Sequence, residues 1–288
     1  HLSPPVSLCL SASLCTMSTP SSSSARSLKI GVVGLGPFAQ FLSKTILKQG
    51  HAITATSRTD YSHICSHLDI SFYRDMGEFF EADNDVILIC TSILSLADVV
   101  KSMPFHRLKR PTLFVDVLSI KEHPREVLLQ VLPPESDVLC THPMFGPQSG
   151  RDGWEGLTFV YDRVRIREEA VCSSFLHIFE SEGCKMLELS CEEHDKLAAR
   201  SQFLSHTIGR ILSEMEIGST SIDTKNFQTL VKLKDSTMED SFDLFSGLFI
   251  YNRFAQQEMM NLEVAFGKVK QKLVDRMNEE SNPSVSNQ

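Results

Sequence analysis

The sequence predicts an α/β fold in which a mostly parallel sheet is followed by an all-helical C-terminal domain. Short apolar runs rich in β-branched residues, at 28–33, 52–57 and 85–91, alternate with helical stretches. Such alternation is typical of parallel strands joined by crossover helices. From about residue 191 the apolar residues recur at helical spacing instead, which predicts helices without further strands.

Each element follows from a local pattern. A helix is expected from 38 to 49, with Gly50 placed as its C-cap, and further strands are expected at 111–117 and 136–141. Helices are then expected at 192–215, 227–233, 241–251 and 254–276.

Four segments follow from these patterns. They are a disordered leader (1–26), a dinucleotide-binding domain (27–190), a helical domain for substrate and dimerisation (191–276) and a disordered tail (277–288). The dimerising role of the helical domain rests on analogy with other nucleotide-binding folds.

The first strand runs directly into Gly34-Leu35-Gly36-Pro37-Phe38-Ala39, a G-x-G-x-x-A pattern. The first glycine permits a tight turn, the second lets the backbone approach a pyrophosphate, and the alanine allows close helix–strand packing. The next helix would direct its N-terminal amides at the phosphates. This context predicts a Rossmann-type dinucleotide site, with residues 34–38 as cofactor contacts. The alternative is a tight turn in an unrelated α/β domain.

The residues at the end of the second strand bear on the choice of cofactor. An NAD enzyme usually carries a carboxylate there, on the ribose 2′-hydroxyl. This chain has Ser57-Arg58-Thr59, whose side chains suit a 2′-phosphate, and we therefore predict NADP. The alternative is that Arg58 is a solvated surface charge and Asp60 binds the ribose.

Polar residues follow several strands. Thr91 and Ser92 come after the strand at 85–91 and are expected beside the nicotinamide, and Ser119 and His142 follow two later strands. Ligands of parallel sheets bind beyond the carboxyl ends of the strands, so Ser92, Ser119 and His142 should converge on one crevice.

Two histidines lie on the helix expected at 192–215. His194 and His206 are twelve residues apart, about 18 Å along the axis, so they cannot share a metal ion on one straight helix. His206 lies in a polar stretch that interrupts the apolar pattern, and this leaves both a structural and a substrate-binding role open.

Composition excludes several classes of function. The chain of 288 residues carries a net charge of −8 without a basic cluster, so nucleic acid is not an expected partner. No run of 18 apolar residues predicts a membrane span. The eight cysteines are scattered without a Cys-x-x-Cys pair, so neither a disulfide framework nor a metal site is expected, and a reducing compartment is favoured.

The first 26 residues are rich in serine, with one arginine and no acid, like an organellar transit peptide or a disordered leader. Met17 as a start would leave too short a leader for targeting. We therefore expect a cytoplasmic protein, with the plastid as the alternative.

Several motifs occur together in a specific order. They are Gly34-Leu35-Gly36, Asp116-Val117-x-Ser119-x-Lys121, Thr141-His142-Pro143-Met144-Phe145-Gly146-Pro147, His194-Asp195-Lys196, Ser201-Gln202-Phe203-x-x-His206-Thr207-x-Gly209-Arg210 and Ser241-Phe242-Asp243-Leu244. With these motifs, residues 28–273 resemble plant arogenate/prephenate dehydrogenases, the terminal enzymes of tyrosine synthesis.

The resemblance implies NADP-dependent oxidative decarboxylation of L-arogenate to L-tyrosine. Hydride leaves the ring carbinol for the nicotinamide, and the ring carboxylate leaves as CO₂. His142 matches the catalytic histidine, which accepts a hydrogen bond from the ring hydroxyl, and Ser119 matches the serine that orients that histidine or the hydroxyl. His206, Gln202 and Ser92 are then substrate contacts. Tyrosine is the product and a candidate inhibitor, and a homodimer is implied.

One position departs from the bacterial relatives, which carry a carboxylate-binding arginine where this chain has Met238. Another cation must then bind the substrate carboxylate, and the candidates are Arg200, Arg210, Lys232 and Lys234.

Asp240 precedes Ser241-Phe242-Asp243, where an acid goes with arogenate preference in plant relatives. A carboxylate there would pair with the ammonium of arogenate, which prephenate lacks. The other interpretation of Asp240 is a surface helix charge.

Three other functions stay open. The first is the same chemistry on prephenate, giving 4-hydroxyphenylpyruvate. The second is a β-hydroxyacid or imine reductase, which would use a lysine such as Lys196. The third is a catalytically inactive NADP-sensing protein, although such a protein would not need His142 and Ser119 together.

Overall fold

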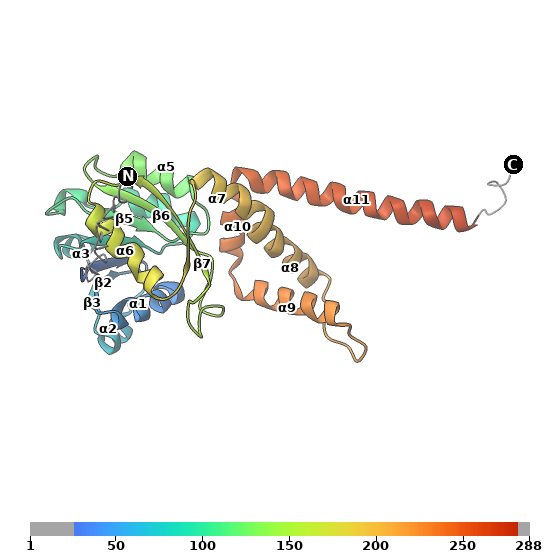
Figure 1. Cartoon of the computed structure of the whole chain (residues 1–288), viewed down its shortest axis with the longest axis horizontal. Helices are drawn as coiled ribbons and strands as arrows, with labels where there is room; N and C mark the ends of the chain where they lie inside the picture. Colours follow the sequence, from blue (N-terminus) through green and yellow to red (C-terminus); the bar gives the residue numbers. More distant parts are fainter. Residues whose placement is uncertain (1–25, 282–288) are drawn as a thin grey trace, which may run out of the picture.

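The structure, a computed structural model, describes residues 26–281. Its centre is an eight-stranded sheet with the order β3-β2-β1-β4-β5-β6-β7-β8 (Figure 1). The strands are β1 (Lys29–Val33), β2 (Ala52–Thr56), β3 (Ser71–Tyr73), β4 (Val86–Ile89), β5 (Leu113–Asp116), β6 (Asp137–Pro143), β7 (Thr158–Arg165) and β8 (Lys185–Glu188). All pairings are parallel except that of β6 with β7, which confirms a mostly parallel sheet.

Helices cover both faces of the sheet. They are α1 (Pro37–Lys48), α2 (Ser62–Leu68), α3 (Met76–Glu81), α4 (Leu96–Lys101), α5 (Glu122–Val131) and α6 (Glu169–Ser181). One apolar core joins α1 and α6 to the face that carries Ile30 and Val32, and a second joins α3, α4 and α5 to the face that carries Ile87 and Ile89. Burial on both faces explains why these strands are continuously apolar.

The turn between β1 and α1 has the geometry that the glycine pattern predicts. Gly34 has φ +89°, and a Cβ there would lie 2.9 Å from the carbonyl oxygen of Cys90, so a larger residue does not fit. Ala39 is buried where α1 packs on the sheet. Gly50, with φ +85°, follows the C-cap residue Gln49, so this expected helix end is confirmed.

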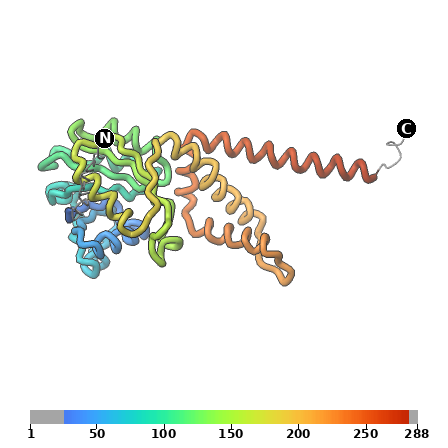
Figure 2. The backbone as a smooth tube through the Cα atoms, in the orientation of Figure 1, coloured from blue at the N-terminus to red at the C-terminus, as the bar shows by residue number. Residues whose placement is uncertain are grey.

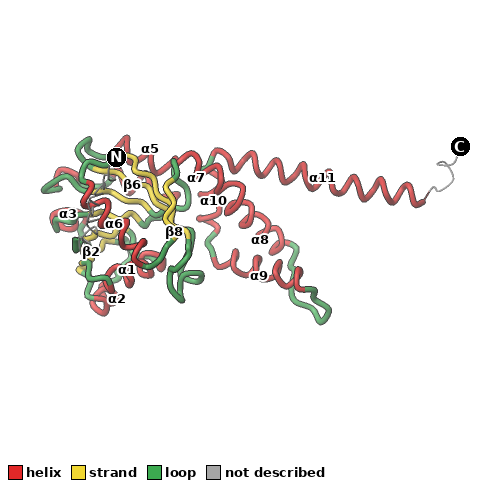
Figure 3. The backbone as a smooth tube through the Cα atoms, in the orientation of Figure 1, coloured by secondary structure: helices red, strands yellow, loops and turns green. Residues whose placement is uncertain are grey.

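After β8 the described chain forms helices joined by loops, without further strands (Figure 3). Helix α7 (Cys191–Ala198) passes through a π-helical turn (Ala199–Phe203) into α8 (Leu204–Glu214), and then follow α9 (Lys225–Glu239), α10 (Phe242–Ile250) and α11 (Arg253–Ser281). Helices α8 and α9 form an antiparallel pair, and α11 extends away from the body (Figure 2). Gly209 lies against Thr237, where a Cβ would collide, so this glycine allows α8 and α9 to approach closely.

The helical part differs from expectation at its end. Helix α11 continues to Ser281, so residues 277–281 are helical and not part of a disordered tail. Arg276 pairs with Glu279 and Glu280, three and four residues on, which supports the extra turn. The rest of the expected tail and residues 1–25 of the expected leader lie outside the described residues. Within residues 26–281, none of the helices has the length and apolar character needed to cross a membrane.

Candidate active site

His142 lies at the carboxyl end of β6, next to the helical part of the molecule. Its side chain is only 4% exposed. Burial, with smaller contributions from His194 and Lys121, lowers the pKa of His142 well below its ordinary value. The imidazole is therefore neutral near pH 7 and can accept a proton.

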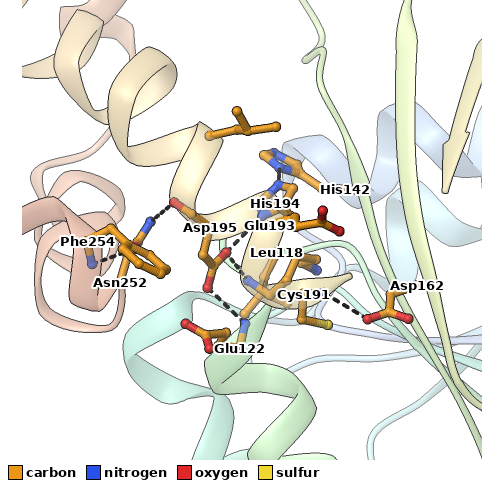
Figure 4. A network of polar contacts seen from close by, with 12 residues as sticks. Leu118, Glu122, His142, Asp162, Cys191, Glu193, His194, Asp195, Asn252 and Phe254 are labelled. Carbon is orange, nitrogen blue, oxygen red and sulfur yellow. Dashed lines mark hydrogen bonds and ion pairs between the residues drawn. The ribbon is translucent and has the colours of Figure 1, made fainter. Parts of the chain in front are cut away.

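A chain of buried polar contacts leads away from His142 (Figure 4). Nδ1 of His142 and Nε2 of His194 are 2.8 Å apart, and Nδ1 of His194 is 2.8 Å from Oδ1 of Asp195. The same carboxylate accepts the backbone N–H groups of Lys121 at 2.7 Å and Glu122 at 2.9 Å, at the start of α5. This relay, defined as His142, His194 and Asp195, joins the end of β6 to α7.

A fully buried ion pair lies behind His142. Lys121 and Asp116 are 1% and 0% exposed, and the Lys121 ammonium also donates to the carbonyl oxygen of Thr141. The Thr141 hydroxyl in turn donates to the carbonyl oxygen of Asp116 at 2.6 Å. These contacts fix the ends of β5 and β6, and therefore the backbone that carries His142.

Ser119 and Ser92 follow strand ends, but neither forms a hydrogen bond with His142 among the described residues. Ser119 forms no side-chain hydrogen bond within residues 26–281, whereas Nδ1 of His142 lies 2.8 Å from Nε2 of His194. Ser92 is exposed, and its hydroxyl accepts the N–H of Ser95 at 3.3 Å to begin a short helical turn. The hydroxyl of Thr91 is buried and has no hydrogen-bond partner in the described part of the chain.

The helix that follows the relay carries a stripe of unpaired polar atoms. Oε1 of Gln202, Nδ1 of His206 and Nε of Arg210 are buried without a hydrogen-bond partner in the described residues. His206 and Arg210, four residues apart, share one face of α8, and Gln202 precedes them in the π-helical turn. Because an unpaired buried polar group costs about 1–3 kcal/mol, this unpaired stripe calls for a partner that the described chain does not supply.

Asp240 lies beside the same unpaired stripe, although it belongs to a different helix. It ends α9, and its Oδ2 lies 3.6 Å from Nε2 of His206. Arg210 donates to the backbone carbonyls of Asp240 and Ser241, at 2.8 and 3.2 Å. Burial lowers the pKa of His206, a change that Asp240 opposes and Arg210 reinforces. The structure thus brings His206 and Asp240 together, although they are distant in sequence.

The four candidate cations occupy different places. Arg200 is 71% exposed and pairs with Glu258, Lys232 is exposed, and Lys234 donates to the carbonyl of Ile217. Only Arg210 of these four lies beside Asp240, and its Nη1 is 4.0 Å from the sulfur of Met238.

The loop after β1 fits a dinucleotide phosphate. Nothing lies within 4 Å of a Cβ built on Gly36, and α1 begins there without a side-chain cap, so its first amides face open space. Pro37 is exposed and Phe38 half-buried at the same turn. The Leu35 side chain is buried in the core, so only its backbone is available to a ligand.

Two arginines lie near each other, Arg58 after β2 and Arg74 after β3. Arg58 and Thr59 are exposed, and Arg74 donates to the carbonyl oxygen of Arg58 at 3.3 Å. Asp60 accepts the N–H and hydroxyl of Ser62 at the start of α2, and these bonds lower its pKa. Asp60 is therefore already engaged in its own turn.

Two protein-family models match the chain. Residues 43–163 match the nucleotide-binding domain of prephenate dehydrogenase, and residues 211–285 match the TYRAAT1-like C-terminal domain. From Arabidopsis thaliana, arogenate dehydrogenase 1, chloroplastic, is 52% identical over 90% of this chain and 41% of its own length. Arogenate dehydrogenase 2, chloroplastic, is 50% identical over 88% of this chain and 72% of its own length.

The chain belongs to the arogenate dehydrogenase family. It spans less than half of the first of these relatives and about three quarters of the second.

Solved structures show the same fold. The prephenate dehydrogenase of Aquifex aeolicus, in complex with hydroxyphenyl propionate and NAD⁺, superposes with a TM-score of 0.71 at 15% identity, covering 89% of this chain and 94% of that one. The arogenate dehydrogenase of Synechocystis gives 0.61 at 19% identity, covering 89% and 98%. At these identities the likeness shows the fold alone.

Sequence reasoning missed two parts of this family member's site. It placed His194 on the long helix without connecting it to His142, and it did not single out Arg74 beside Arg58. The motif His194-Asp195 was the available signal for the first, because a carboxylate next to a histidine often orients it. No local pattern marked Arg74, which reaches Arg58 only through the pairing of β2 and β3.

Proposed function

We propose that the chain oxidises and decarboxylates L-arogenate to L-tyrosine with NADP as the oxidant. The observation that carries this proposal is the state of His142, which is buried, neutral and bonded only through Nδ1. Its Nε2 has no partner among the described residues, and it lies at the strand edge where ligands of such sheets bind. The names of the Arabidopsis relatives support the same activity.

The chain's own groups then have defined tasks. When bound, the nicotinamide supplies the hydride acceptor. Nε2 of His142 takes the proton of the ring hydroxyl as the carbinol carbon is oxidised, and returns it to the phenol oxygen once CO₂ has left and the ring is aromatic. No net proton is released, so His142 needs only to hold one proton during turnover.

Gln202, His206 and Arg210 supply the substrate side of this proposal. Their unpaired stripe offers an acceptor, a titratable ring and a cation. Arg210 is the candidate that best fits the substrate carboxylate, because it contacts Met238, where bacterial relatives carry their arginine, and two of its nitrogens lack an oxygen partner. Ser119 and Ser92 stay predictions as contacts to the ring hydroxyl and to the substrate.

The position of Asp240 favours arogenate over prephenate. Its carboxylate, 46% exposed and adjacent to His206, is open to an ammonium group. With prephenate, the Asp240 carboxylate would face a keto group and the side-chain carboxylate of the substrate, and it would have no ammonium group to pair with. Lys196, which a reductase of the β-hydroxyacid or imine type would use, is exposed, and this disfavours that alternative.

Initial rates with both substrates test this assignment. We expect the wild-type chain to use arogenate in preference to prephenate, and Asp240→Asn to lower the ratio of the two kcat/KM values about tenfold or more, which is about 1.4 kcal/mol of discrimination. Asp243→Asn, in the first turn of α10, is the matched control and should leave the ratio unchanged. An unchanged ratio in Asp240→Asn would contradict the role of Asp240 in specificity. A wild-type chain that turns over neither substrate would contradict the proposed function.

The residues after β2 and β3 support NADP as the cofactor. Arg58 and Arg74 offer two cations near a 2′-phosphate, Ser57 and Thr59 offer hydroxyls, and Asp60 is engaged with Ser62. In the same assay, kcat/KM should be higher for NADP than for NAD. Arg58→Ala should reduce that preference without affecting the rate with saturating NAD. Equal use of both cofactors by the wild type would contradict the assignment of NADP.

Helix α11 supports assembly into a homodimer. Large apolar residues stay more than half exposed along it, a pattern that usually marks an interface. They are Met260, Val264, Phe266, Val269, Leu273 and Met277. Light scattering of the purified chain should give twice the 32.3 kDa mass of one chain, and a monomer at assay concentrations would refute the dimer.

The names of the relatives favour the plastid over the cytoplasm as the compartment. Both Arabidopsis proteins are described as chloroplastic. A fluorescent protein fused behind the natural full-length protein in plant cells tests this, and a diffuse cytosolic signal would contradict the plastid.

A further inference from the structure

We propose that His194 and Asp195 serve His142 as a positioning pair that fixes its tautomer and takes up its second proton during turnover. The taking up of a proton rests on the proposed function, whereas the tautomer does not. Neither residue touches the expected substrate directly, and both act through the imidazole of His142.

The donors and acceptors of the relay can be placed in only one consistent order. The Asp195 carboxylate can only accept, and it already accepts the N–H groups of Lys121 and Glu122. Nδ1 of His194 must therefore donate to it. In a neutral His194 the other nitrogen, Nε2, is then an acceptor.

This order determines the state of His142. Because Nε2 of His194 accepts, Nδ1 of His142 must carry the hydrogen of the 2.8 Å bond between them. The lone pair of neutral His142 is then on Nε2, the atom without a protein partner. Asp195 thus specifies, through His194, which nitrogen of His142 can act as the base.

The same contacts allow the proton to move on. As the ring O–H bond breaks and an N–H bond forms at Nε2 of His142, the hydrogen on Nδ1 passes to Nε2 of His194. His142 becomes neutral in its other tautomer, and His194 becomes an imidazolium ion in contact with the Asp195 carboxylate. When the phenol oxygen recovers its proton, both transfers reverse, so charge and atoms balance.

The Asp195 carboxylate makes this second transfer favourable. A positive charge on His142 would be buried near the Lys121 ammonium without a carboxylate in contact, whereas on His194 it lies 2.8 Å from Asp195. The other titratable groups around the relay are Asp116 behind Lys121, Cys140 on β6, Cys191 on α7 and His123 on α5. Among the described residues, only Asp195 accepts a hydrogen bond from the His194 ring.

Asp195 is also held rigidly enough for this task. It is fully buried, its carboxylate caps the first amides of α5, and its backbone carbonyl accepts Nδ2 of Asn252 at 2.8 Å. Three segments of the chain, at the start of α5, in α7 and before α11, therefore fix the carboxylate.

The variant that separates the two roles is His194→Gln. Its Oε1 can take the place of Nε2 and accept from Nδ1 of His142, but it cannot take up a proton. We expect KM for arogenate to stay within about threefold, kcat to fall about tenfold or more, and the acid limb of the pH profile to move to lower pH, because His142 alone must then carry the charge. His177→Gln, on the exposed face of α6, is the matched control and should change none of these three quantities.

A second measurement does not depend on turnover. Nitrogen-15 NMR of the histidine-labelled wild-type chain near pH 7 should show His142 with hydrogen on Nδ1 and not on Nε2, with His142→Asn used to assign its signals. Hydrogen on Nε2 would overturn the proposal even in an active enzyme. An unchanged kcat and an unmoved acid limb in His194→Gln would overturn the proton transfer, whereas a wild type inactive on arogenate would overturn only the proposed function and the step that rests on it.

Discussion

Replacing His142 by Asn is expected to lower kcat for arogenate about 10²–10⁴-fold, the range typical of a lost general base. The amide fills much of the same volume at the end of β6, but it cannot take the proton of the ring hydroxyl. The change also removes the terminal member of the relay. Steady-state kinetics at saturating NADP measure the effect.

The affinity for the cofactor provides the control for His142→Asn. The phosphate loop at Gly34–Gly36 lies at a different strand end, so the Kd for NADPH, measured by fluorescence titration, should stay within about twofold. A kcat within tenfold of the wild type, with cofactor binding intact, would exclude His142 as the base.

Replacing Lys121 by Met is expected to destabilise the folded chain by about 3–5 kcal/mol. Asp116 is fully buried, and its Oδ1 pairs with the Lys121 ammonium, while its Oδ2 already lacks a partner among the described residues. Removing the ammonium would leave a buried carboxylate without a cation, next to the N–H of Leu118 and the thiol of Cys140. The free energy of unfolding from urea titration measures the loss.

The double variant Asp116→Leu with Lys121→Met is the control for that prediction. Two apolar residues of similar volume leave no buried charge, so at least half of the lost stability should return. A loss below about 1 kcal/mol in Lys121→Met would show that the pair is not shielded from water as the structure has it.

Local patterns were sufficient to predict five of the eight strands and the turn after β1, whereas β3, β7 and β8 were not predicted. The run that became β4 is apolar throughout, and the one that became β1 is apolar after Lys29, because both faces of the sheet are covered. The turn at Gly34 is recognisable because its left-handed backbone, crowded by Cys90, admits only glycine. The position of His142 at a strand end followed from the same pattern, since β6 is a continuous apolar run up to Thr141.

Contacts between distant elements could not be predicted in this way. The approach of His194 to His142 depends on how α7 packs beside the end of β6, and the helical spacing of residues 192–215 gives no indication of it. The π-helical turn at Ala199–Phe203, which lies between the relay and the unpaired stripe, also leaves no mark in an apolar pattern. The sequence singled out Asp240 as a candidate, but only the junction of α9 and α10 shows that it meets His206.

The pH dependence of kcat/KM for arogenate with NADP is the measurement that tests the neutral base most directly. Burial lowers the pKa of His142, and the base works when neutral, so its activity is present above that pKa and is lost as the pH falls through it. The account predicts a plateau that extends through pH 7 and an acid limb below 6.5, absent from the residual activity of His142→Asn. An acid limb at or above pH 6.5, or one that persists in that variant, would contradict it.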